Sequence, residues 1–164
     1  MTGPPRLIDV SHTVEHGLVT YQGLPAPIVC DYLSREASRR RYSPGTEFQI
    51  GKIEMVANTG TYMDAPSHRF PEGADIAGYA LEQVADLPGI VVRASGRAVT
   101  PAHFAGIDVR GQAVLVHTGW DVHWRSARYG RGNPYLSADA ARHLVAAGAA
   151  LVGIDSLNID DVDD

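Results

Sequence analysis

The stretch SADAARHLVAAGAALVGID, residues 137–155, decides the fold class because it places a helix directly before a buried strand. Ser137 is suited to accept a hydrogen bond from a first-turn amide, and residues 138–147 follow as the helix. Gly148 suits the left-handed residue that ends many helices. Residues 150–155 form an apolar run that is typical of a strand buried on both faces. The stretch therefore predicts one helix–strand unit of an α/β domain.

Further strands are predicted upstream of this unit. Residues 7–11 indicate a short strand, residues 48–57 alternate apolar and polar side chains as in a half-buried strand, and residues 89–93 indicate another strand. Residues 113–117 form a second run typical of a fully buried strand. Thr100, which precedes a proline, predicts the start of a brief helix. Strands outnumber helices, so we expect a strand-rich α/β fold with a mixed sheet and few helices.

Length and composition are those of one conventional domain, which we expect to span residues 1–164. The chain has 164 residues, of which 45% are hydrophobic, and its formal net charge is −5. No basic face is visible, so nucleic-acid binding is not expected. No apolar run approaches the roughly 20 residues that span a bilayer, and the N-terminus has no apolar signal region, so we expect neither a membrane span nor a secretory signal. The single Cys30 suits a reducing cytoplasm, and a buried thiol is the favoured interpretation.

The segment NTGTYMDAPSH, residues 58–68, carries most of the chemistry. Asp64 and His68 are four residues apart, but Pro66 between them would break a helix. The spacing therefore predicts a rigid loop that holds a carboxylate and an imidazole toward one cavity. A carboxylate can bind a divalent cation, and an imidazole can bind a metal or transfer protons near neutral pH. The alternative is structural, with Asp64 capping a turn and His68 hydrogen-bonded at the surface.

This segment resembles the signature His-x-Gly-Thr-His-x-Asp-x-Pro-x-His of the cyclase family, which includes bacterial kynurenine formamidase and isatin hydrolase. Five of its positions match in register, and they are Gly60, Thr61, Asp64, Pro66 and His68. Similarity extends over essentially the whole chain, through residues 7–12, 20–25, 116–120 and 151–155. The resemblance implies a strand-rich domain of the kynurenine-formamidase type, similar to the swivelling β/β/α fold.

The resemblance also implies an activity. It points to a hydrolase that cleaves a non-peptide C–N bond, in an amide or lactam, of a small aromatic or cyclic compound. His68 would transfer the proton to the leaving nitrogen, and Asp64 would orient an ion or the attacking water. Tyr21, Thr61 and Tyr62 would contact the substrate, and the two motif hydroxyls could also donate hydrogen bonds to a developing oxyanion. Family members are usually dimers or tetramers, so a homodimer or homotetramer is implied.

Three departures from the family affect the expected cofactor. Asn58 and Tyr62 stand where the family has two metal-binding histidines, which leaves Asp64 and Asn58 as the metal candidates. Neutral Asn oxygen is a weak zinc ligand, whereas manganese or magnesium would tolerate it better. The third departure is that relatives continue beyond Asp164 with a further His and Glu ligand, so we expect that the C-terminal portion is missing. Zinc or manganese is thus the cofactor the resemblance implies, in a weakened site.

Two other functions stay open. The same residues could run metal-free acid–base chemistry on a carbonyl compound, as in a polyketide-type cyclase or dehydratase. Loss of two ligand histidines is also what a noncatalytic binding homologue would show.

Two further groups of side chains have alternative interpretations. His117 ends a predicted strand and could line either the core or a pocket, with the core favoured. Trp120 follows it and could contribute to a pocket for an aromatic compound. The C-terminal acidic residues could form a cation site, although a solvated acidic tail is favoured. These residues are Asp155, Asp160, Asp161, Asp163 and Asp164.

Overall fold

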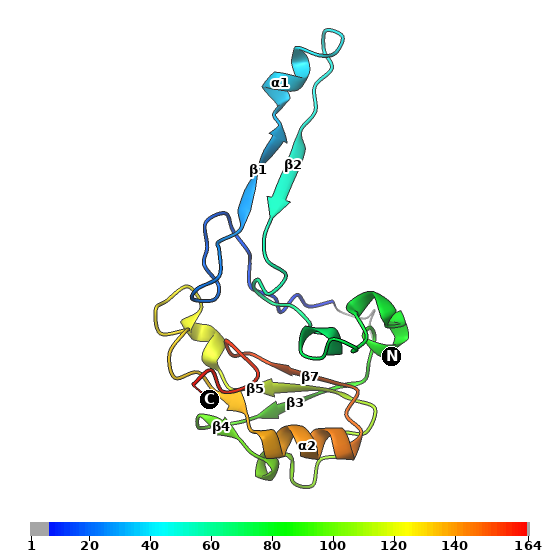
Figure 1. Ribbon diagram of the computed structural model, residues 1–164, viewed down its shortest axis with the longest axis vertical. Coiled ribbons are helices and arrows are strands. Elements are labelled where there is room, and N and C mark those ends of the chain that lie inside the picture. Colours follow the sequence, from blue (N-terminus) through cyan, green and yellow to red (C-terminus); the bar gives the residue numbers. More distant parts are fainter. Residues whose placement is uncertain (1–6, 164) are drawn as a thin grey trace, which may run out of the picture. The chain divides into compact units, whose positions relative to one another are not determined.

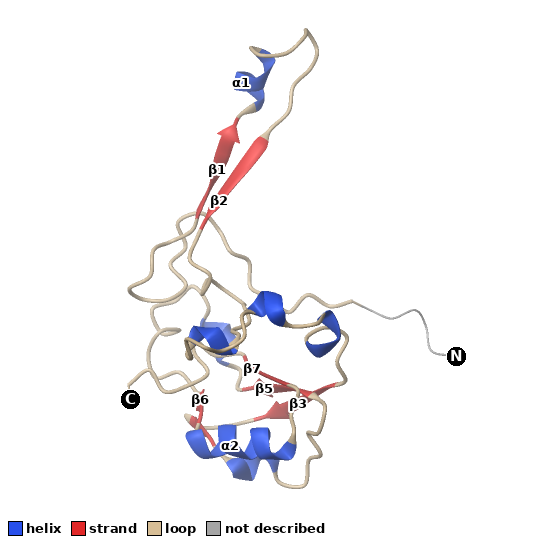
Figure 2. Ribbon diagram, turned by 45° about the vertical axis from the view of Figure 1, so that its right-hand side comes forward, coloured by secondary structure: helices blue, strands red, loops and turns tan. Residues whose placement is uncertain are grey.

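A computed structural model describes residues 7–163 and is shown in Figures 1 and 2. Its contacts divide the chain into two compact units, residues 1–63 and residues 64–164, which are described separately. In residues 7–163, no helix combines the length and the apolar character required to cross a bilayer.

The first unit contains a two-stranded antiparallel ribbon. Strand β1 (Ile28–Leu33) pairs with β2 (Ile50–Glu54), and helix α1 (Arg35–Arg39) lies in the connection between them (Figure 1). Ser34 caps α1 by accepting a hydrogen bond from the Ala37 amide at 3.1 Å, which satisfies one unpaired donor of the first turn. We refer to β1 and β2 together as the β1–β2 ribbon.

The second unit is built on a three-stranded parallel sheet with the order β3-β5-β7. These strands are β3 (Gly89–Arg93), β5 (Ala113–His117) and β7 (Leu151–Ile154). Their register aligns Arg93 with His117 and Val116 with Ile154, so the carboxyl ends of all three strands meet at one edge. The short strands β4 (Ala98–Val99) and β6 (Tyr135–Leu136) form a separate parallel pair.

Helix α2 (Ala138–Ala147) supplies one layer of the core in this unit (Figure 2). Its buried residues Ala140 and Leu144 belong to one apolar cluster with Val92 of β3 and Val114 of β5. Phe104 joins the same cluster from the 3₁₀ turn η4 (Pro101–Phe104). Burial of these side chains is the main contribution to the stability of the second unit.

Single-turn 3₁₀ helices fill the connections of the second unit. Besides η4, they are η1 (Pro66–His68), η2 (Ile76–Gly78), η3 (Leu81–Gln83) and η5 (Trp120–His123).

Most predicted elements of the second unit are confirmed. Strands β3 and β5 and helix α2 have the predicted bounds. Ser137 and Gly148 cap α2 at its two ends, and Gly148 has a φ of 80°. A strand-rich α/β fold with few helices is also confirmed, although the parallel and antiparallel pairs lie in separate sheets. The single-domain prediction for residues 1–164 stays a prediction.

Several predictions about the first unit are wrong. Residues 7–11 form no strand, because their backbone pairs with no neighbouring strand. Strand β2 lies within the predicted segment, but its side chains are exposed on both faces because its sheet has only two strands. Cys30 is exposed rather than buried for the same reason.

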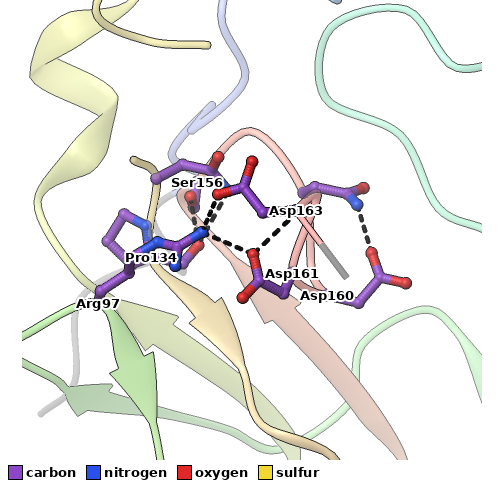
Figure 3. A network of polar contacts seen from close by, with 8 residues as sticks. Arg97, Pro134, Ser156, Asp160, Asp161 and Asp163 are labelled. Atoms are coloured by element: carbon purple, nitrogen blue, oxygen red, sulfur yellow. Dashed lines mark hydrogen bonds and ion pairs between the residues drawn. The ribbon is translucent and has the colours of Figure 1, made fainter. Parts of the chain in front are cut away.

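The C-terminal acidic segment is not a freely solvated tail (Figure 3). The Arg97 guanidinium donates hydrogen bonds to Asp161 at 2.6 Å and to Asp163 at 2.5 Å. The Ser156 hydroxyl donates to the Pro134 carbonyl at 2.6 Å, which attaches the start of the segment to the loop before β6. These two carboxylates therefore form ion pairs with Arg97, and Asp164 lies outside the described residues.

Candidate functional site

Asp64 and His68 lie on a tight turn of the second unit, as the proline between them predicts. Pro66 opens the 3₁₀ turn η1, and the His68 amide donates to the Ala65 carbonyl at 2.9 Å. Gly73 packs so closely on this turn that an added Cβ would lie 2.6 Å from the Pro66 backbone. The turn is therefore held by backbone contacts that only glycine permits at position 73.

The two side chains face each other on this turn. His68 Nδ1 lies 3.7 Å from Asp64 Oδ1, and the side chains are 57% and 45% exposed. This distance is too long for a direct hydrogen bond but short enough for an electrostatic contact between the two side chains. The structure thus presents a carboxylate–imidazole pair that a small molecule can reach.

The earlier part of the motif belongs to the first unit. The His12 amide donates to Thr61 Oγ1 at 3.4 Å, and the Gly60 amide donates to Thr20 Oγ1 at 3.4 Å. Gly60 has a φ of 71°, and an added Cβ would lie 2.7 Å from Val14. The glycine turn therefore brings Gly60 and Thr61 together with the N-terminal loops of the first unit that carry His12 and Thr20.

The other predicted site residues, which are Tyr21, Asn58 and Tyr62, also belong to the first unit. Tyr62 is 40% exposed, and Tyr21 is half-buried at the start of a turn closed by the Leu24 amide. Asn58 belongs to the first unit and Asp64 to the second. The assignments of Tyr21, Thr61 and Tyr62 to substrate, and of Asn58 and Asp64 to a metal, stay predictions.

A second polar group lies at the carboxyl edge of the parallel sheet, and sequence reasoning did not assemble it. Arg93 Nη1 and His117 Nδ1, at the ends of β3 and β5, are 2.9 Å apart. His117 Nε2 lies 3.8 Å from Asp155 Oδ2, just after β7. His117 is therefore half-exposed at the sheet edge, and the expectation that it lines the core is wrong because its strand ends there. Each residue lies at, or directly after, the carboxyl end of a parallel strand, and this shared position is the signal that could have grouped them.

Asp155 fixes the chain that leaves β5. Its Oδ1 accepts hydrogen bonds from the Thr118 amide at 2.8 Å and the Thr118 hydroxyl at 2.6 Å. Its Oδ2 accepts from the Gly119 amide at 2.7 Å, where Gly119 has a φ of 74°. One carboxylate thus satisfies three donors of a turn that also contains a left-handed residue.

This observation gives a stability prediction. Asp155→Ala leaves three donors without their acceptor, and we expect it to lower the free energy of unfolding by about 3 kcal/mol. Urea denaturation of the two proteins measures the difference. The matched control is Asp139→Ala, which removes an exposed ion pair with Arg142 and should change stability by less than about 0.5 kcal/mol. Equal effects of the two substitutions would contradict the assigned role of Asp155.

Three residues at or near this same edge of the sheet could hold a metal ion in the second unit. His117, Asp121 and Asp155 offer one nitrogen and two oxygen atoms, all within 4.8 Å of one another. In kind, one imidazole and two carboxylates suit a divalent ion. The three residues are therefore a candidate metal centre, and it differs from the predicted pair Asp64 and Asn58.

The hydrogen bonds of this cluster oppose an ion. A guanidinium has only donors, so His117 Nδ1 must accept from Arg93, and the proton of a neutral ring then lies on Nε2. A metal at Nε2 would move that proton to Nδ1, directly against the guanidinium, and a metal at Nδ1 would displace Arg93. Three of the carboxylate lone pairs of Asp155 are also in use. As it stands, the cluster fits a hydrogen-bonded network and not an open coordination site.

Comparison with known proteins agrees with this fold and motif. The Cyclase family model, described as "Putative cyclase", matches residues 8–161. Kynurenine formamidase of Maricaulis maris is 30% identical over 94% of this chain and 71% of its own length. Kynurenine formamidase of Bacillus cereus strain ATCC 14579 is 25% identical over 96% of this chain and 71% of its own length.

Solved structures show the same fold at lower identity. Isatin hydrolase A from Labrenzia aggregata superposes with a TM-score of 0.73 at 20% identity, over 94% of this chain and 69% of that one. A protein described as a potential metal-dependent hydrolase with cyclase activity gives a TM-score of 0.66 at 22% identity, over 94% of this chain and 71% of that one.

These matches define the class of protein. The fold is the strand-rich α/β fold of the cyclase relatives, and the motif of residues 58–68 lies inside the matched range. The chain belongs to the Cyclase family, as the motif predicted. The relatives named above by sequence are hydrolases.

Proposed function

We propose that this chain is a hydrolase that cleaves the C–N bond of a small aromatic amide or lactam. The observation that carries the proposal is the Asp64–His68 pair, with Nδ1 and Oδ1 3.7 Å apart on an accessible turn. Family membership supports it, because sequence relatives named kynurenine formamidase are 25–30% identical over nearly the whole chain. The predicted substrate contacts of Tyr21, Thr61 and Tyr62 belong to this proposal.

The pair supplies the proton transfers that amide hydrolysis requires. His68 takes a proton from water as the water oxygen attacks the carbonyl carbon, and the Asp64 carboxylate stabilises the imidazolium that results. The tetrahedral intermediate then collapses, and His68 returns the proton to the nitrogen as the C–N bond breaks. An open-chain amide then gives a neutral arylamine and a carboxylic acid, whereas a lactam ring opens to one product that carries both groups.

A substrate series tests the proposed activity. The purified protein is incubated with an N-formyl arylamine, a bicyclic aryl lactam and an N-formyl alkylamine. The amine and formate released from the formamides, and the ring-opened amino acid formed from the lactam, are quantified. We expect turnover of the arylamine or lactam substrate in preference to the alkylamine. Absence of turnover on both aromatic substrates, from protein shown to be folded, would contradict the proposal.

Chelation tests the role of a metal separately. The His117–Asp121–Asp155 group is already hydrogen-bonded to Arg93 and to the turn after β5, and the predicted Asp64–Asn58 site lacks the two histidines that Asn58 and Tyr62 replace. We therefore expect EDTA to leave the rate unchanged. The same assay is repeated after adding zinc or manganese to the chelated protein. Loss of activity with EDTA and recovery with either ion would show that the enzyme needs a metal.

A noncatalytic binding protein is the second candidate, favoured by Asn58 and Tyr62 at the positions of two ligand histidines. Such a protein would bind the aromatic amide and release it unchanged. Calorimetry with the intact substrate, followed by recovery of that substrate, distinguishes it from the hydrolase.

A further inference from the structure

Helix α2 covers one face of the β3-β5-β7 sheet (Figures 1 and 2). The side chains on this face, which include Val92 and Val114, are buried in one cluster with residues of α2. Because successive side chains of a strand point to opposite faces, the alternate residues of β3 and β5 point away from α2. We call this second face the open face, and its residues are Val91 and Arg93 of β3, Leu115 and His117 of β5, and Gly153 of β7.

The apolar part of the open face is accessible. Val91 and Leu115 are neighbours in the register and are 61% and 42% exposed. Gly153, the next residue across the sheet, has no side chain, and an added Cβ would lie 3.2 Å from Leu115 Cδ2. Parallel sheets normally have both faces covered, so this exposure is unusual. Two adjacent apolar side chains beside a glycine form a shallow surface on which an aromatic ring can lie.

Arg93 lies at the carboxyl end of the open face and pairs with no carboxylate in the described part of the chain. Its guanidinium Nη1 lies 2.9 Å from His117 Nδ1, which accepts the hydrogen bond. Arg97 and Arg142 of the same unit, in contrast, both form ion pairs with carboxylates. A guanidinium has five N–H donors in a planar fork that matches a carboxylate. His117 therefore holds Arg93 in place and leaves most of its donors for an anion.

The surrounding charges determine the direction from which an anion can approach. Asp155 Oδ2 lies 3.8 Å from His117 Nε2, the ring nitrogen that does not contact Arg93. Asp121 brings a second carboxylate close to His117, whereas the charge of Asp155 is partly offset by the three hydrogen bonds that it accepts. An anion is therefore repelled on the Nε2 side of the ring and reaches Arg93 over the apolar residues. The site lies at the carboxyl ends of parallel strands, where open α/β sheets usually bind their ligands.

We propose that the open face binds a free aromatic carboxylate, whose ring lies on Val91 and Leu115 and whose carboxylate accepts hydrogen bonds from Arg93. Apolar contact and charge neutralisation come from adjacent residues of two strands, so a compact aromatic acid fits better than a small anion or a neutral ring. The site does not depend on the proposed hydrolase, because binding is measured without turnover.

A nuclear magnetic resonance titration of the protein tests the site with benzoate as the probe. We expect a dissociation constant on the order of 1 mM, which is within the range for a ligand with so few atoms, and amide shifts concentrated in residues 91–93 and 115–117. Benzyl alcohol keeps the ring without the charge, and acetate keeps the charge without the ring, so both should bind at least about 10-fold more weakly. Absence of benzoate binding by the folded protein, or equal binding of either control compound, would overturn the proposal.

Substitution of Arg93 tests which residue holds the carboxylate. Arg93→Gln removes the charge, and we expect it to weaken benzoate binding by about 10- to 100-fold, the usual effect of losing a hydrogen bond between charged groups. Arg93→Lys keeps the charge without the planar fork and should lose less affinity, which separates binding from a structural role. Arg142→Gln removes an exposed charge on α2 and should leave the affinity unchanged. If Arg93→Gln bound benzoate as tightly as the unmodified protein, or if Arg142→Gln lost the same affinity, the proposal would be wrong.

Discussion

Replacing His68 by alanine is expected to lower kcat/KM for an aromatic amide by about 100- to 10,000-fold. The substitution removes the group that accepts the proton of water and returns it to the leaving nitrogen. The His68 side chain is 57% exposed, so its removal should leave the fold intact. Steady-state kinetics of the two proteins with an N-formyl arylamine measure the difference.

Two controls separate chemistry from local structure. Added imidazole should restore part of the activity of His68→Ala, because it can enter the space and transfer the proton. Arg69→Ala changes the exposed neighbour at the end of the same turn and should retain activity. An active His68→Ala protein, or an Arg69→Ala protein that loses activity equally, would show that His68 has no chemical role.

Replacing Phe104 by alanine is expected to lower the free energy of unfolding by about 3–5 kcal/mol, the usual cost of removing a large buried aromatic side chain. Phe104 is 1% exposed and belongs to the apolar cluster of the second unit. Its removal leaves a cavity among side chains from the sheet and from α2. Urea denaturation followed by circular dichroism measures the change.

The matched control is Val145→Ala on α2. Val145 is 80% exposed, so shortening it should change stability by less than about 0.5 kcal/mol. If Phe104→Ala cost no more than Val145→Ala, the assigned core would be wrong.

The elements of the second unit could be predicted because their signals are local. Ser137 and Gly148 mark the ends of α2, and short apolar runs mark β3 and β5. Each of these features depends on residues within one turn or one strand. Local patterns of this kind survive in the folded chain because tertiary packing supports them.

The ribbon could not be predicted from the same kind of pattern. Strand β1 reads IVCDYL, which has neither clean alternation nor a continuous apolar run, and it forms because it pairs with β2. Alternation correctly located β2, but it could not show that both faces would be exposed. That exposure depends on how many strands join the sheet.

The motif located Asp64 and His68 correctly on one turn, because Pro66 restricts the backbone between them. The Arg93–His117–Asp155 row was not assembled, since its members are separated by 24 and 38 positions and meet only through the sheet register. The pairing of Arg97 with Asp161 and Asp163 could not be predicted either, because 64 and 66 positions separate these residues in the sequence.

The proposal that the Asp64–His68 pair activates water is tested most directly by hydrolysis of an N-formyl arylamine in ¹⁸O-labelled water. We expect the unmodified protein to release free arylamine together with formate that carries one ¹⁸O atom, and His68→Ala to release neither at a comparable rate. Tight binding of the amide with no arylamine released and no label incorporated would contradict the hydrolase and leave a binding protein in its place.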